Sequence, residues 1–230
     1  MDDAIVIDRI GSVTVWQIGT AVYFRAGMAI DVDGAPNAYH PPTDDHPESG
    51  RPPGFDDLRN AGYPGNWWGI ATDDAGEPIV QGADQPFPGW YVSTTALSSG
   101  AASDPRSYVD ATTVPFFVLP SGFGHDVSLG DLGMVLSGAY HQSGAIYADV
   151  GPSDAIGEGS VALSIALGLF QAVTIGHDAH TIDYLVFPGS RGSPPWPRPL
   201  EAIRYGAEAL FAHWGGRDRL RAFKASLATP

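Results

Sequence analysis

The chain has no cysteine and little positive charge, and both shortages exclude whole classes of protein. Without cysteine it can form neither a disulfide framework nor a zinc site built on thiolates. Its 12 Lys and Arg residues are outnumbered by 26 Asp and Glu residues, which gives a formal net charge of −14 at pH 7. Such a surface repels nucleic acid and anionic membranes and attracts polycations. We therefore expect no nucleic-acid partner, and the acidity either only aids solubility or matches a cationic substrate.

Several sequence signals are missing as well. No apolar run reaches membrane-spanning length, so we expect no membrane partner. Met1 is followed by an acidic pair instead of a basic and then an apolar region, so no ordinary signal peptide is expected. Nucleophile elbow, P-loop, dinucleotide fingerprint and paired-histidine zinc motif are all absent. We expect neither a cofactor nor a metal, and we expect a monomer.

Glycine and proline, in contrast, are abundant, with 29 and 20 residues, as is typical of folds with many turns. Between the turns, short β-branched and aromatic runs predict strands. These runs lie at residues 13–18, 21–25, 28–32, 67–72, 79–81, 90–95, 115–119, 132–136, 145–149 and 182–187. The stretch 35–65 has neither a strand nor a helix period, which indicates a long loop. The fold class is therefore mainly β.

Helices are expected mainly at the C-terminal end. Residues 160–167 form a short apolar run without breakers, which predicts one buried helix. After a linker, apolar residues recur with helical spacing. They are Leu200, Ile203, Ala207, Leu210, Phe211 and Trp214. A basic helix is expected at 217–227. We expect residues 1–188 to form the main β domain and residues 189–230 to form a linker and a helical extension packed on it.

Two carboxylates stand at the ends of predicted elements, with a short turn between them. Asp149 ends an apolar strand, and Glu158 precedes the apolar helical run and is flanked by Gly157 and Gly159. Glycines beside a carboxylate allow backbone or ligand to approach closely. Two carboxyl groups in one cleft are what hydrolysis of a glycosidic bond requires. From the pattern alone, a helix cap at Glu158 and a turn residue at Asp149 are the simpler explanation.

Seven short segments form an ordered set of motifs along residues 20–188. They are residues 22–34 (VYFRAGMAIDVDG), 91–97 (YVSTTAL), 108–111 (YVDA), 114–120 (VPFFVLP), 130–131 (GD), 149–160 and 176–178 (GHD). Each motif is weak alone, but the ordered set resembles glycoside hydrolase family 75, the fungal-type chitosanases. The resemblance implies endo-hydrolysis of chitosan, a polymer of β-1,4-linked glucosamine, with inversion at the anomeric carbon. It also implies secretion.

The resemblance places the catalytic aspartate of the family at Asp149 and its catalytic glutamate at Glu158. One departure is Gly159, where the family has alanine after the glutamate. The apolar neighbours Ile156 and Val161 favour Glu158 as the general acid and Asp149 as the base, because desolvation raises a carboxyl pKa. The N-terminus of the predicted helix acts in the opposite direction, because its positive dipole end lowers the pKa of Glu158.

Residues within the same motifs are candidates for substrate binding. The candidates are Asp31, Asp33, Tyr91, Ser93, Asp131 and His177. Asp31 and Asp33 offer carboxylates for a glucosamine ammonium group, or simply make a turn. They look like a fragment of a calcium loop, but the remaining ligands of that loop are missing. The pairs Trp67–Trp68 and Trp90–Tyr91 serve either core packing or stacking on a sugar.

The architecture is the subject of a looser resemblance. A Gly-Asp pair before a strand, a strand that ends in Asp-x-Gly, and a glycine-rich return are similar to the double-psi β-barrel of expansins, family 45 endoglucanases and one type of lytic transglycosylase. We therefore expect a six-stranded barrel of this type with long loops and C-terminal helices. The same architectural resemblance leaves two alternatives to a chitosanase. One is a muramidase or lytic transglycosylase acting on peptidoglycan, and the other is a non-catalytic, expansin-like carbohydrate-binding protein.

Overall fold

The computed structural model describes residues 4–43, 55–169 and 178–227, and within them β-strands predominate. The strands are β1 (Ala4–Ile10), β2 (Val13–Ile18), β3 (Ala21–Asp31), β4 (Phe116–Pro120), β5 (Leu132–Ser137), β6 (His141–Gly151), β7 (Glu158–Ser160) and β8 (Asp178–Phe187). The helices are α1 (Val161–Ala166), α2 (Leu200–Trp214) and α3 (Gly216–Leu227), with short 3₁₀ turns at Leu58–Ala61 and Pro105–Ser107. No helix in the described ranges has the length and apolar character needed to cross a bilayer.

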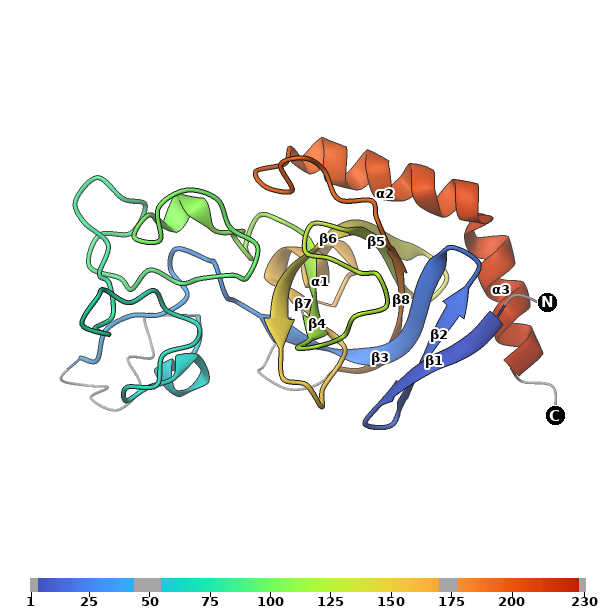
Figure 1. The fold of residues 1–230 in the computed structure, drawn as a ribbon, viewed down its shortest axis with the longest axis horizontal. Coiled ribbons are helices and arrows are strands. Elements are labelled where there is room, and N and C mark those ends of the chain that lie inside the picture. Colours follow the sequence, from blue (N-terminus) through green and yellow to red (C-terminus); the bar gives the residue numbers. More distant parts are fainter. Residues whose placement is uncertain (1–3, 44–54, 170–177, 228–230) are drawn as a thin grey trace.

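Six of these strands close into a barrel in the order β3-β7-β4-β6-β5-β8, and β8 pairs again with β3. The pairs β3–β7 and β4–β6 are parallel, and the other neighbours in the barrel are antiparallel. Figure 1 shows the barrel near the centre of the molecule, with α2 and α3 along one side. The expected mainly β fold, with a closed six-stranded barrel, long loops and C-terminal helices, is confirmed.

An N-terminal hairpin extends the barrel wall. Strand β1 pairs with β2, and β2 continues antiparallel onto β3. The sequence pattern missed β1, because Asp8 and Arg9 interrupt its apolar alternation and most of its side chains are at least partly exposed. Two positive-φ glycines, Gly11 and Gly19, make the turns at either end of β2.

Residues 32–43 and 55–115 lie between β3 and β4 and form a lobe of loops beside the barrel (Figure 1). Strands were predicted here at 67–72, 79–81 and 90–95. Only isolated bridges form, such as those between Ile70 and Ser93 and between Val80 and Tyr91. Each segment has a β-branched or aromatic pattern, but its bridges to neighbouring segments involve single residues and do not extend into a regular ladder.

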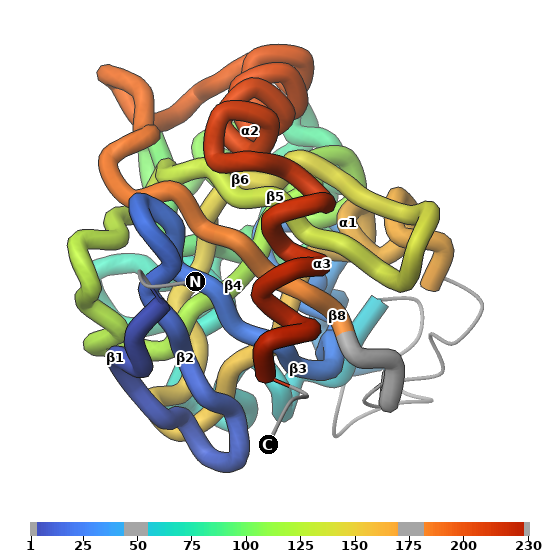
Figure 2. Tube along the Cα trace, turned by 90° about the vertical axis from the view of Figure 1, so that its right-hand side faces the viewer, coloured from blue at the N-terminus to red at the C-terminus, as the bar shows by residue number. Residues whose placement is uncertain are grey.

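The C-terminal helices cover β5 and β6 and the end of the hairpin, as Figures 1 and 2 show from two sides. Helix α2 buries Ile203, Ala207, Phe211 and Trp214, and the indole Nε1–H of Trp214 donates to the Ile18 carbonyl at 2.8 Å. The predicted apolar face is therefore correct except at its first residue, because Leu200 remains 48% exposed. Burial of this face ties the helical extension to the barrel.

Candidate active site

The predicted catalytic residues and the two acidic residues of the first motif meet in one cleft. Asp31 ends β3, Asp33 follows two residues later, Asp149 lies near the end of β6, and Glu158 begins β7. All four line a cleft with a volume of about 540 Å³. Asp31, Asp33 and Glu158 also line an adjoining polar cavity of about 200 Å³. The barrel thus brings together carboxylates that are as much as 127 positions apart in the sequence.

Strand register places Asp149 and Glu158 on either side of one residue of β4. Val118 pairs with Asp149 on one edge of β4 and with Glu158 on the other. Directly paired residues point to the same face of a sheet, and all three line the cleft. Two inter-strand spacings separate the Cα atoms of the two acids, which corresponds to roughly 10 Å.

Glu158 belongs to a strand and does not cap a helix. Helix α1 begins three residues later, and its N-cap is Ser160, whose Oγ accepts from the Leu163 N–H at 3.1 Å. The same Oγ accepts from the Phe116 N–H at 3.0 Å, which ties β7 and α1 to β4. Capping therefore does not explain the glutamate, and its carboxyl group is available to the cleft.

The glycines beside Glu158 allow β7 to pack tightly between its neighbours. A Cβ atom on Gly157 would lie 2.6 Å from Cβ of Ala26, and Gly157 has a φ of 104°. A Cβ atom on Gly159 would lie 2.8 Å from a methyl carbon of Leu163. A larger residue at Gly157 would also meet the Gly27 carbonyl at 2.7 Å and would require a backbone shift, whereas one at Gly159 would displace the Leu163 side chain. The expected close approach is thus real, but the atoms that approach belong to the protein.

Asp149 is largely shielded from solvent and is held by the backbone. Its Oδ1 accepts from the Ala96 N–H at 2.9 Å and from the Val150 N–H at 2.8 Å. Burial raises the pKa of Asp149 to about 6, while these two hydrogen bonds lower it. Both donors favour the ionised form, so Asp149 is suited to carry a negative charge in the cleft.

Glu158 has a less supportive environment for its charge. Within the described part of the chain, no hydrogen bond is found to its carboxyl group. Burial, followed by the nearby negative charge of Asp149, raises the pKa of Glu158 to about 7. The two environments therefore differ: Asp149 has two backbone donors, and Glu158 has none that the described residues provide. That difference favours a protonated Glu158 beside an ionised Asp149.

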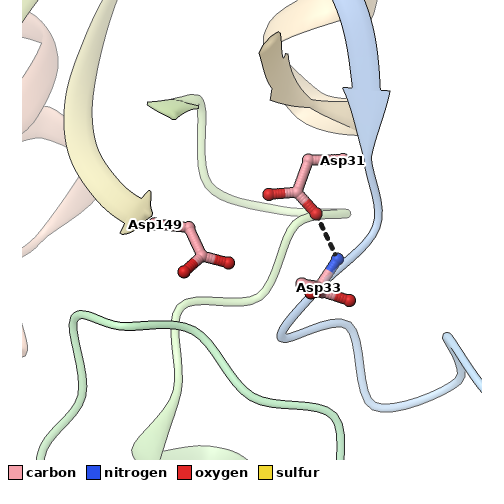
Figure 3. Close-up of side chains that lie close together, drawn as sticks. All are labelled: Asp31, Asp33 and Asp149. Carbon is pink, nitrogen blue, oxygen red and sulfur yellow. Dashed lines mark hydrogen bonds between the residues drawn. The ribbon is translucent and has the colours of Figure 1, made fainter. Parts of the chain in front are cut away.

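Asp31 and Asp33 complete the acidic floor of the cleft. Asp31 is 7% exposed, and its Oδ1 accepts from the Asp33 N–H at 2.7 Å, as the dashed line in Figure 3 marks. Asp33 accepts from the Tyr39 hydroxyl at 2.6 Å. Burial raises the pKa of both carboxyl groups well above the usual range, and the charge of Asp149 raises both further. The four acids therefore cannot all ionise without a large cost.

Three of these carboxylates are also close enough to share a cation. Figure 3 shows Asp149 facing Asp31 and Asp33 across a gap, and one oxygen from each lies within 4.8 Å of the others. Carboxylate oxygens are the ligands that Ca²⁺ and Mg²⁺ prefer. Local pattern does not reveal this third ligand, because Asp149 is distant from the first motif in the sequence. The expectation of no metal stays a prediction.

Two predicted substrate-binding residues, Ser93 and Asp131, are fully buried and are not among the residues that line the cleft. Ser93 is fully buried; its Oγ accepts from the Gly34 N–H at 3.0 Å and donates to the Gly69 carbonyl at 3.2 Å. It therefore secures the turn that follows Asp33. Asp131 is also fully buried, and its carboxylate accepts from the backbone N–H groups of Ser128 and Arg191, each at 2.8 Å. It organises a turn before β5.

The remaining two candidates have different outcomes. Tyr91 does not line the cleft; its ring is 5.9 Å from that of Trp67, and its N–H donates to the Tyr39 carbonyl at 3.1 Å. It therefore supports the loop lobe, and its contact with substrate stays a prediction. His177 lies outside the described residues.

The sequence interpretation missed several residues that the loop lobe supplies to the site. Tyr39 holds Asp33, and Arg59, Asn60 and Trp68 line the cleft. Only the Trp67–Trp68 pair carried a signal, and it did not show which ring faces the cleft. The others come from the stretch that was interpreted as loop without assigned function.

A scan of the chain against protein-family models finds no match, and a search of curated proteins finds none either. The resemblance to the family 75 chitosanases therefore stays a prediction.

Proposed function

We propose that this chain is an endo-acting glycoside hydrolase that cleaves the β-1,4 bonds of chitosan by an inverting acid/base mechanism. One observation carries the proposal: Asp149 and Glu158 face one cleft from opposite sides of Val118, and their environments give their carboxyl groups different proton affinities. Two carboxyl groups with separated pKa values are the requirement for acid/base cleavage of a glycosidic bond.

The environments of the two carboxyl groups support the proposed roles. Glu158, whose pKa is about 7, keeps its proton in weakly acidic solution and donates it to the leaving glycosidic oxygen. Asp149 accepts two backbone hydrogen bonds that favour its charged form, so it removes a proton from the attacking water. The C–O bond to the leaving sugar breaks as water adds to the anomeric carbon, and the two protons end on the leaving oxygen and on Asp149.

The spacing of the two strands is compatible with single displacement. Inverting enzymes hold their two carboxyl groups about 6.5–9.5 Å apart so that a water fits on the far side of the sugar, whereas retaining enzymes need about 5–5.5 Å. Asp149 and Glu158 are two strands apart, with Cα atoms separated by roughly 10 Å. Such a separation leaves room for the sugar and the water together.

The charge of the chain supports an amino-sugar polymer as the substrate. The net charge is −14, and four carboxylates line the cleft. Deacetylated chitosan carries ammonium groups in weakly acidic solution, so the cleft attracts it over a Debye length of about 10 Å. Protonated substrate also reduces the mutual repulsion among Asp31, Asp33 and Asp149.

The test is release of reducing ends from highly deacetylated chitosan by the parent chain, Asp149→Asn and Glu158→Gln. We expect each substitution to lower the rate by about 10²–10⁴-fold, because general acid and general base each contribute this much. Glu77→Gln removes the same group from an exposed turn outside the cleft and should retain the parent rate.

Other outcomes of this experiment would favour a different function. Activity that survives Glu158→Gln but not Asp149→Asn would favour the single-carboxylate lytic transglycosylases. A parent chain that releases no reducing ends from chitosan would refute the chitosanase proposal, and peptidoglycan and plain polysaccharide binding would then be tested.

A further inference from the structure

The consecutive tryptophans of the loop lobe have opposite surroundings. Trp67 is half-buried and packs edge-on against Tyr63, with ring centroids 6.0 Å apart, and against Tyr91. Trp68 is 61% exposed and lines the cleft that holds the carboxylates. Large apolar side chains that stay exposed in a concave site are characteristic of ligand binding. Packing explains Trp67, but it does not explain the exposed indole of its neighbour.

The Trp68 indole is held in place. Its Nε1–H donates to the Asn60 carbonyl at 2.9 Å, and its backbone N–H donates to the Ala61 carbonyl at 3.1 Å. Both acceptors belong to the 3₁₀ turn Leu58–Ala61. The polar edge of the indole is therefore satisfied by protein, which leaves the apolar ring surface for a ligand. A ring fixed in this way loses little conformational entropy when a ligand covers it.

The chemistry of the cleft matches a pyranose ring. Besides Trp68, the apolar side chains of Val118, Val150 and Pro152 line it, and Val150 is 40% exposed. No second aromatic ring lines this cleft among the described residues. The carboxylates repel an anionic ligand, and a bare cation gains nothing from apolar walls. A pyranose has an apolar C–H face and polar edges, so it suits both parts of the lining.

We infer that Trp68 stacks on the face of one sugar ring of the polymer and so defines a subsite beside the acid pair. The inference rests on the proposed function, since the bond that Asp149 and Glu158 cleave must lie next to that subsite. Trp68 is thereby a specificity-determining residue that holds the chain and does not transfer protons. Its contribution is apolar, so it is independent of the ammonium groups that the carboxylates attract.

The test measures binding by calorimetry with two uncleaved probes, a glucosamine hexamer and its neutral N-acetylated counterpart. Trp68→Ala and Trp68→Phe are made in the Glu158→Gln background to prevent turnover. Trp68→Ala should weaken binding of the glucosamine hexamer about tenfold or more, as loss of an aromatic stacking partner does. Trp68→Phe should restore most of the affinity. Tyr140→Ala is the matched control, because Tyr140 is an aromatic residue, 92% exposed, outside the cleft.

Salt and the neutral probe separate stacking from charge. Raising the salt concentration should weaken binding of the glucosamine hexamer to every variant. The ratio of the dissociation constants of Trp68→Ala and its parent should stay unchanged. For the neutral hexamer, Trp68→Ala should raise the dissociation constant by a similar factor. Because Trp68 is largely exposed, thermal melts of the variants should match, so a loss of binding cannot be assigned to unfolding.

The outcomes distinguish this inference from the proposed function. If both hexamers bind through Trp68 but chitosan is not cleaved, the proposed function fails and the subsite stands. If chitosan is cleaved and Trp68→Ala binds as tightly as its parent, the subsite is refuted and the function stands. If the parent binds neither hexamer, both are refuted.

Discussion

Replacement of Glu158 by glutamine should make the folded chain more stable at alkaline pH while it removes the proposed activity. The reason is the position of the carboxyl group. Burial and the charge of Asp149 both oppose ionisation of Glu158, and no hydrogen bond from the described residues offsets them. Above its pKa the folded protein carries an unfavourable charge that the unfolded chain carries freely. Glutamine has nearly the same shape and never ionises.

The magnitude follows from the shift in proton affinity. The pKa of Glu158 rises from its ordinary value of 4.5 to about 7. Each tenfold change in an ionisation constant corresponds to about 1.4 kcal/mol, so the full effect is about 3 kcal/mol. The carboxyl group keeps some contact with solvent in the cleft, so screening reduces the expected gain in the free energy of unfolding to about 2–3 kcal/mol. For a chain of this size that corresponds to roughly 5–10 °C in melting temperature.

The sign of the pH dependence is fixed by the direction of the shift. A carboxyl group whose pKa is raised in the folded state contributes stability that is fully present below the unfolded pKa, near 4.5. That stability is lost as the pH rises through about 7. Parent and Glu158→Gln should therefore melt together near pH 4 and separate progressively up to about pH 8, with the variant higher.

The assay is thermal unfolding followed by circular dichroism across this pH range for parent, Glu158→Gln and Glu77→Gln. The last variant removes an exposed charge from a chain of net charge −14 and so measures the general benefit of lower repulsion. The expected difference between the two variants appears only above about pH 5. An equal gain from both variants, or a gain from Glu158→Gln that is the same at pH 4 and pH 8, would refute the account of a desolvated Glu158.

Two further predictions concern the rate and the helical extension. The rate constant kcat/KM on chitosan should be bell-shaped, rising through the pKa of Asp149 near 6 and falling through that of Glu158 near 7; a profile that rises steadily to pH 9 would contradict the assigned roles. Trp214→Ala should lower the free energy of unfolding in urea by about 3–5 kcal/mol, because it empties a buried site and removes the indole hydrogen bond to the Ile18 carbonyl. Tyr205→Ala, at an exposed position of the same helix, should cost less than about 0.5 kcal/mol.

The elements that local pattern predicts are those whose side chains alternate between core and solvent or form an apolar run. Helix α2 could be located from its apolar spacing, because the same residues bury against β5 and β6. Strands β4 and β5 could be located because nearly all of their side chains are buried. Strand β1 could not, since its sequence is mixed and only its place at the edge of the barrel wall makes it a strand.

The site was predictable only in part, because burial of a polar group depends on distant contacts. Asp131 and Asp33 both stand beside a glycine in a turn-like sequence. Asp131 is fully buried and accepts hydrogen bonds from backbone N–H groups, whereas Asp33 lines the cleft. No local feature separates them. In the same way, Trp67 and Trp68 differ in surroundings because Trp67 packs against Tyr63, whereas the indole N–H of Trp68 donates to the Asn60 carbonyl at the cleft.

The relation between Asp149 and Glu158 depends on the register of the short strand β7. Glu158 lies opposite both Ala29 of β3 and Val118 of β4, and Val118 lies opposite Asp149. A slip of β7 by one residue would turn Glu158 to the other face of the barrel wall and separate the pair. A strand of three residues has few hydrogen bonds to prevent this. Gly157 supplies much of the missing specificity, because a side chain there would collide with Ala26 and the Gly27 carbonyl of β3, and Gly159 packs closely against Leu163 of α1. The two glycines that first suggested access for a ligand therefore act as positioning residues for the acid pair.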